Sequence, residues 1–154
     1  MRRSFVTAVF VLPLVFPSAP GLRTSVVMRD GPAPGQLALV VRIESTDLSL
    51  GSYQGTLKFT PGSLAIVSAS APAGEGTRMV NAADTTKGIV HFAGFTVSGY
   101  SRVDVLTLVV RATRAPAAAN IVASVDVAGD VNGKPVPHER ITPARGITTD
   151  STRR

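Results

Sequence analysis

The segment GSYQGTLKFTPGSLAIVSAS, residues 51–70, decides the fold class of this chain of 154 residues. Apolar and polar residues alternate along its first half, which is the period of a β-strand with one buried and one solvated face. Pro61 and Gly62 end that strand, because proline lacks an amide hydrogen and glycine tolerates the turn, and residues 64–67 begin a second strand. The predicted buried residues are Tyr53, Leu57 and Phe59, and the predicted solvated residues are Ser52, Gln54, Thr56 and Lys58.

The same period recurs along the chain, and no stretch after residue 21 has the spacing of an amphipathic helix. Turn-forming clusters of Gly, Pro, Asn and Asp separate the apolar runs, and residues 97–102 are expected to form a loop. Eight to nine short strands without crossover helices predict an all-β, antiparallel β-sandwich of jelly-roll or Greek-key form. The expected strands beyond the opening segment are 25–28, 36–44, 78–82, 89–95, 103–113, 121–128 and a weak last segment ending near Ile147.

The first 21 residues have the pattern of an export signal. Arg2 and Arg3 provide a positive start, residues 5–16 form an apolar run, and small residues follow, so cleavage is expected after Gly21. The alternative is a membrane anchor that is not cleaved, which is the one way in which the chain would contact a membrane. The sequence therefore predicts a secreted, periplasmic or cell-surface domain at residues 22–147, with a flexible tail at 148–154.

Composition excludes several functions. The chain has no cysteine, so thiol catalysis and disulfides are excluded, and the domain must depend on its core. The net charge is +6, but after the predicted signal the arginines are scattered singly along the sequence, apart from Arg153 and Arg154 at its end. Nucleic-acid binders cluster their basic residues or interleave them with aromatic residues, so no nucleic-acid partner is expected. The basic composition instead predicts solubility and a weak attraction to anionic surfaces.

The titratable residues do not form an enzyme motif. His91 and His138, the two histidines of the chain, have no serine or carboxylate at a catalytic spacing, so the protein is predicted not to be an enzyme and to need no cofactor. The loop that contains Asp126, Asp130 and Asn132 fails the EF-hand template. Those three residues are weak candidates for a looser calcium site, and the alternative is an acidic hairpin turn.

Three stretches resemble the cohesin family, the secreted β-sandwich modules that receive dockerins in cellulosome scaffolds. They are the strand, corner and strand of residues 51–67, the segment 87–93 with a glycine before an apolar strand, and the long strand 104–112 with its partner at 119–127. The resemblance covers residues 24–142. Cohesins often present asparagine and aspartate where this chain has Ser52 and Gln54, and Thr60 replaces an aspartate at the corner.

The resemblance implies a non-catalytic recognition module that docks a dockerin-like protein partner on one flat sheet face. The candidate contacts are the polar residues of the opening strand: Ser52, Gln54, Thr56 and Lys58. One alternative is a carbohydrate-binding module of a polysaccharide-degrading system, in which Tyr100 is the candidate exposed ring for stacking on sugar. The other alternative is a structural subunit of the cell envelope.

Overall fold

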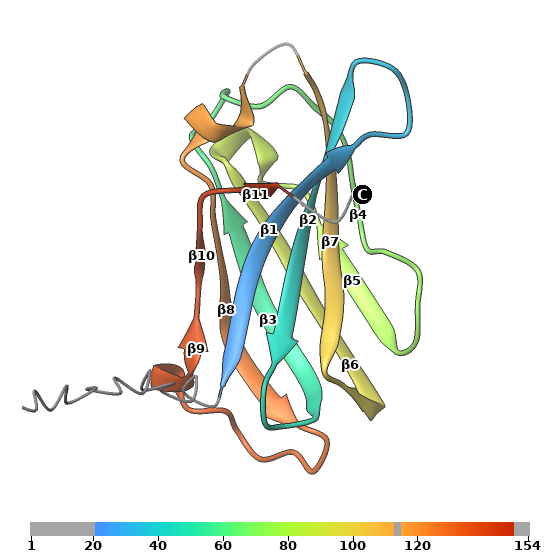
Figure 1. Cartoon of the computed structure of the whole chain (residues 1–154), viewed down its shortest axis with the longest axis vertical. Helices are drawn as coiled ribbons and strands as arrows, with labels where there is room; N and C mark the ends of the chain where they lie inside the picture. Colours follow the sequence, from blue (N-terminus) through green and yellow to red (C-terminus); the bar gives the residue numbers. More distant parts are fainter. Residues whose placement is uncertain (1–20, 113–114, 150–154) are drawn as a thin grey trace, which may run out of the picture.

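The chain folds as two β-sheets packed face to face (Figure 1). The computed structural model describes residues 21–149 except 113–114. The first sheet has the strand order β11-β1-β2-β7-β4, with β9 also paired to β1, and the second has the order β10-β8-β3-β6-β5. The bounds are β1 Leu22–Asp30, β2 Gln36–Ser45, β3 Leu50–Lys58, β4 Ile66–Ser70, β5 Thr77–Asn81, β6 Ile89–Tyr100, β7 Arg102–Arg111, β8 Val122–Asp130, β9 Ile141–Thr142, β10 Ala144–Arg145 and β11 Thr148–Thr149.

This architecture confirms the predicted antiparallel sandwich. The described residues contain eleven strands rather than eight or nine, because the weak last segment is divided into three strands of two residues each, β9, β10 and β11. Short 3₁₀ turns are the only helical elements of the described chain: η1 (Thr85–Lys87), η2 (Pro116–Ala119) and η3 (His138–Arg140). Accordingly, the described residues include no helix of the length and apolarity needed to cross a bilayer.

The core lies between the two sheets and is built from the residues that the alternation predicts. Leu57 and Phe92 are almost completely buried, at 0% and 1% exposure, and they belong to the same core cluster as Leu39 and Leu108 of the other sheet. Phe59 is also buried, at 6% exposure, beside the corner that Pro61 begins. Apolar side chains removed from water in this way contribute the main stabilisation of a domain without disulfides.

Two β-bulges change which residues face the core. The pairing of β2 with β7 shifts between Val41 and Arg42, so Val105 is an extra residue, and both Val105 and Leu106 are completely buried. Residues 103 and 105 therefore face the core before the bulge, and 106, 108 and 110 face it afterwards. A second shift, between Gln54 and Gly55 in the pairing of β3 with β8, leaves Asp126 as an extra, exposed residue.

Two sequence-based boundaries were wrong. Residues 97–102 do not form a loop, because β6 continues to Tyr100 and β7 begins at Arg102; the pairing with β3 is irregular there, and Gly99 has a φ of 82°. The first strand is not limited to the predicted residues 25–28. It has nine residues, and β9 and β11 pair with it on the side opposite to β2.

The ends of the domain are fixed by hydrogen bonds. The Gly21 amide donates to Thr46 Oγ1 at 3.1 Å, and the Thr46 amide donates to the Gly21 carbonyl at 3.2 Å. At the other end, Thr148 and Thr149, which lie in the segment predicted as tail, pair in parallel with β1. Residues 1–20 of the predicted signal, which spans 1–21, and the last residues of the predicted tail, 150–154, lie outside the described residues, and the cleavage site stays a prediction.

Candidate docking face

The outer face of the second sheet is built by cross-strand rows of side chains from β5, β6, β3 and β8. One row contains Met79, Ala93, Gln54 and Val127, which stand opposite one another in register. The neighbouring rows are Thr77, Phe95 and Ser52 on one side, and Asn81, His91, Thr56 and Ser124 on the other. Gln54 therefore lies in the middle of a surface that four strands share.

This face carries most of the large apolar side chains that the described protein leaves in water. Met79 is 58% exposed, Phe95 is 55% exposed and Val127 is 63% exposed. Val97, near the end of β6, is 90% exposed. Such a concentration on one face of a sheet is typical of a surface that another molecule covers.

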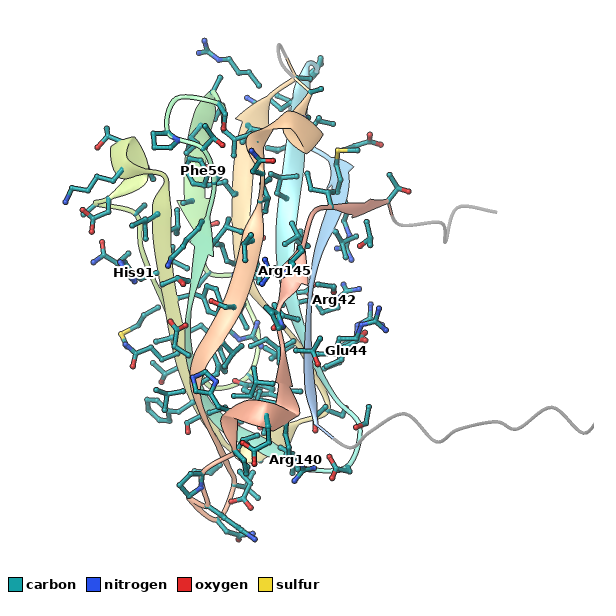
Figure 2. All side chains as sticks on the ribbon, turned by 90° about the vertical axis from the view of Figure 1, so that its left-hand side faces the viewer. Arg42, Glu44, Phe59, His91, Arg140 and Arg145 are labelled. Atoms are coloured by element: carbon teal, nitrogen blue, oxygen red, sulfur yellow. The ribbon has the colours of Figure 1, made fainter. Side chains whose placement is uncertain are left out.

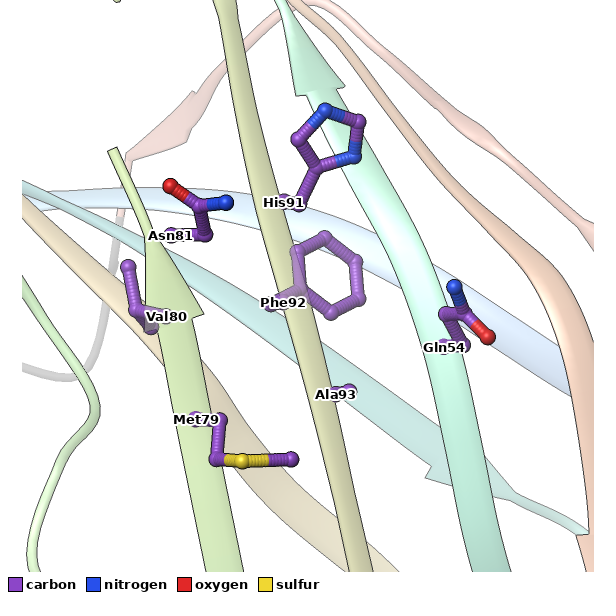
Figure 3. Close-up of a pocket in the computed structure, with 7 residues that line it drawn as sticks. All are labelled: Gln54, Met79, Val80, Asn81, His91, Phe92 and Ala93. Atoms are coloured by element: carbon purple, nitrogen blue, oxygen red, sulfur yellow. The ribbon is translucent and has the colours of Figure 1, made fainter. Parts of the chain in front are cut away.

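The centre of the face is hollowed into an open depression of about 500 Å³. Figure 3 shows its lining: Met79 and Asn81 come from β5, His91 and Ala93 from β6, and Gln54 from β3. The short Ala93 side chain lies between the longer Met79 and Gln54 side chains, which leaves the space open. The depression is apolar except for the amides of Gln54 and Asn81 and the His91 imidazole.

The charged side chains of this face lie at its rim rather than at its centre. Lys87 Nζ donates to Asp84 Oδ1 at 2.7 Å, and His91 Nε2 lies 3.8 Å from Asp84 Oδ2. The hydrogen bond from Lys87, together with its positive charge, lowers the pKa of Asp84 below its ordinary value, and the same contact raises the pKa of Lys87. Both side chains are exposed, so this pair contributes a fixed local charge pattern rather than appreciable stability.

The predicted contact residues of β3 all point outward, but they are not equally available. Ser52, Gln54 and Lys58 are exposed. Thr56 is 9% exposed, because its cross-strand neighbours His91 and Ser124 cover it, and its hydroxyl shares a hydrogen bond of 3.4 Å with Ser124 Oγ. The expectation that Thr56 is a solvated contact was therefore wrong.

Tyr100 was wrongly predicted to be an exposed ring. It is 7% exposed, and its hydroxyl donates to the Glu75 carbonyl at 2.6 Å. The Arg78 guanidinium lies 5.5 Å from its ring centroid, and the Tyr53 ring lies 6.4 Å away. These contacts join the β4–β5 loop to the end of β6, so Tyr100 has a structural role, and the ring exposed on this face is Phe95.

Sequence reasoning missed the apolar part of the face. Phe95 lies two residues beyond Ala93 and four beyond His91, so the alternation of β6 directs all three side chains outward. That signal could have identified Phe95. Val127 could not be assigned in this way, because the bulge at Asp126 reverses the alternation of β8. Met79 could be placed on this face only with the knowledge that β5 pairs with β6.

The candidate calcium ligands Asp126, Asp130 and Asn132 lie in two different local structures, a turn and a β-bulge. The Asp130 carboxylate accepts hydrogen bonds from the Asn132 and Lys134 amides at 2.8 and 2.9 Å, which is the geometry of an acidic turn. Asp126 lies on the bulge, where its Oδ1 accepts from Ser124 Oγ at 3.3 Å. In the part of the chain that the structure describes, no group of three or more His, Asp or Glu side chains is arranged to hold a metal ion.

Comparison with solved structures decides the fold family. A type I cohesin–dockerin complex from Clostridium thermocellum superposes with a TM-score of 0.54 at 10% identity, covering 88% of this chain and 99% of that one. A type II cohesin domain from the cellulosome of Acetivibrio cellulolyticus has a TM-score of 0.52 at 14% identity, with 86% and 93% covered. This chain has a cohesin-like fold.

A non-cellulosomal cohesin from Archaeoglobus fulgidus has a TM-score of 0.50 at 14% identity, with 82% of this chain and 91% of that one covered. No protein-family model and no curated protein sequence matches the chain. The resemblance to cohesins is thus visible in the arrangement of the strands and only weakly in the residues.

Proposed function

We propose that this cohesin-like domain is an exported, non-catalytic recognition module that docks a protein partner on the outer face of β5, β6, β3 and β8. The observation that carries the proposal is the exposed apolar row around Gln54, with Met79 at 58% and Val127 at 63% exposure. Protein interfaces combine an apolar centre with a polar rim, and this face has that arrangement.

The chemistry of the face also defines the partner. The central row contains no charged side chain; Lys58, Asp84 and Lys87 lie toward one end of the face, and Asp126 lies on the β8 bulge next to Val127. A partner that buried a carboxylate against Met79 and Val127, or an ammonium against Met79, would leave that charge without a counter-charge, at considerable cost. The partner therefore presents an uncharged, mainly aliphatic surface with an amide or a hydroxyl for Gln54.

Two similarities support a dockerin-like partner. The similar Clostridium thermocellum structure is a complex of a cohesin with a dockerin. In addition, the segment 51–67, which resembles cohesin, contains the strand that bears Gln54. The proposed partner differs from a strict dockerin, because Ser52 and Gln54 stand where cohesins often present an asparagine and an aspartate.

Carbohydrate binding by this face is the weaker alternative. Modules that bind polysaccharide surfaces need several exposed rings in one plane, and Tyr100 is buried. Among the described residues, Phe95 is the one aromatic side chain that is more than half exposed. A single ring does not form a stacking platform.

Affinity capture from the envelope fraction of the source cell tests the proposal. The bait proteins are the wild-type chain, Gln54→Arg, and the matched control Ser68→Arg, which places the same side chain on the exposed surface of β4 in the other sheet. We expect the wild type and S68R to capture the same partner and Q54R to lose it. Capture that is equal for both arginine variants would refute the assignment of the face.

A further inference from the structure

The outer face of the opposite sheet gathers arginines that are far apart in the sequence. Arg23 and Arg29 lie on the outward side of β1, Arg42 on that of β2, and Arg102 and Arg111 on that of β7. Figure 2 shows Arg42 and Glu44 on the side of the sandwich opposite to His91. The prediction that the arginines are scattered is thus true of the sequence but not of the folded protein.

The bulge in β7 is what brings the last two arginines to one side. Arg102 and Arg111 are nine residues apart, an odd number, so a regular strand would direct them to opposite faces. Because Val105 is an extra residue, both point away from the core. Arg42 and Asp104 lie opposite each other on the same outward face.

Carboxylates pair with several of these arginines. Arg42 donates two hydrogen bonds to the Asp104 carboxylate in a bidentate salt bridge, with Nε 2.7 Å from Oδ1 and Nη2 3.2 Å from Oδ2. Glu44 lies 3.6 Å from Arg102 Nε and also opposite Arg23 in the register of β1 and β2. Arg23 and Arg111 are exposed at opposite ends of this face, whereas the three lysines of the described chain, Lys58, Lys87 and Lys134, lie elsewhere.

The surface between the arginines is formed by short side chains and bears hydroxyl groups. Val27, Ala38, Val40 and Val109 form its floor, each between 5% and 8% exposed, and Ser25, Thr107, Ser68 and Ser70 stand around them. The arginines at the two ends of β1 are six residues apart, which corresponds to about 20 Å along the strand. A linear molecule lying along the strands would reach arginines at both ends of this floor.

We propose that this second face binds an acidic polysaccharide, through its carboxylates. The guanidinium groups would form bidentate salt bridges with the carboxylates of the polysaccharide, in the geometry that Arg42 already has with Asp104. The serine and threonine hydroxyls would contact the sugar hydroxyls between them. A bilayer fits this face less well, because Val67 is its only strongly exposed large apolar side chain among the described residues, and surface-bound membrane proteins insert several.

Affinity electrophoresis of the full chain tests this proposal, with polygalacturonate in the gel and neutral dextran as the control polymer. Polygalacturonate should retard the wild type at low salt, and dextran should not. In Arg23→Glu with Arg111→Glu, the dissociation constant should rise about tenfold or more. The matched control, Lys87→Glu with Lys134→Glu, makes the same change in net charge away from this face and should change it less than about twofold.

Equal weakening in the two double variants would overturn the proposal, because net charge alone would then explain the binding. It would also be overturned by a wild type that polygalacturonate does not retard, or that binds anionic phospholipid vesicles or duplex DNA more tightly than this polymer. The neutral pair R23Q with R111Q, compared with K87Q with K134Q, repeats the test if a charge reversal prevents folding. Thermal melting of every variant verifies that the domain is intact.

Discussion

The buried hydroxyl of Tyr53 makes the domain sensitive to alkali in a way that can be calculated. Tyr53 is 3% exposed in the middle of β3, and its hydroxyl oxygen has no hydrogen-bond partner among the described residues. Burial raises the pKa of Tyr53 from its ordinary value of 10.0 to about 12, the neighbouring Tyr100 adds to the rise, and Arg78 opposes it.

The sign and size of the effect follow from this pKa. Below pH 10 the tyrosine is neutral in both the folded and the unfolded chain, so its burial has no pH-dependent cost. Between pH 10 and about 12 the unfolded chain loses the proton while the folded chain retains it, so the free energy of unfolding falls. Two pKa units at about 1.4 kcal/mol each correspond to a loss of about 3 kcal/mol, a large part of the stability of a small domain.

Tyr53→Phe is the variant that isolates the effect, because it retains the ring contact with Phe92, whose centroid is 6.3 Å away. At pH 8, Y53F should be as stable as the wild type or more stable by about 1 kcal/mol, since it removes an unpaired buried hydroxyl. Urea unfolding followed from pH 8 to pH 11.5 measures the difference between the two proteins. That difference should grow in favour of Y53F above pH 10.

A parallel decline of both proteins above pH 10 would show that Tyr53 is not the alkali-sensitive group. A variant that is about 2 kcal/mol less stable at pH 8 would show that the hydroxyl has a strong partner, which would contradict the buried, unpaired position assigned to it.

Three further perturbations test the core and the pairing of the sheets. Phe59→Ala should cost about 3 to 5 kcal/mol of unfolding free energy in urea, whereas Lys58→Ala on the exposed side of β3 should cost less than about 0.5; similar midpoints would mean that the faces are assigned wrongly. Gly94→Ala places a methyl group against the Tyr53 side chain and the Thr77 carbonyl, so it should lower the melting temperature; an unchanged melting temperature would contradict this packing. Asp104→Asn removes the charge that faces the nearly buried Arg42 and should cost more than Glu44→Gln, which faces the exposed Arg102; thermal melts that rank the two in the reverse order would contradict it.

The sandwich could be predicted from the sequence because its strands alternate regularly. Leu57, Phe59, Val90 and Phe92 have the burial that their positions indicate. Alternation is a local property, and it fails where an extra residue enters a strand. The β7 bulge at Val105 and the β8 bulge at Asp126 depend on the partner strands, so a single sequence does not reveal them.

The candidate site could be predicted only along one strand. Ser52, Gln54 and Lys58 are exposed as their alternation indicates, but a sheet face is made by neighbours that are remote in sequence. The register of β5, β6 and β8 places Met79, Ala93 and Val127 beside Gln54. Tyr100 was misjudged for the same reason, because the Glu75 carbonyl and Arg78 that cover it come from another part of the chain.

Site-specific photo-crosslinking tests the central claim, that the face around Gln54 docks a protein partner. A benzophenone amino acid is introduced at position 52, beside Gln54 on the same face, in one protein and at position 68, on the other sheet, in a second, and each is irradiated with the captured partner. The docking assignment predicts a cross-linked complex from position 52 and none from position 68. A cross-link from position 68 alone, with an intact partner complex in both proteins, would contradict it.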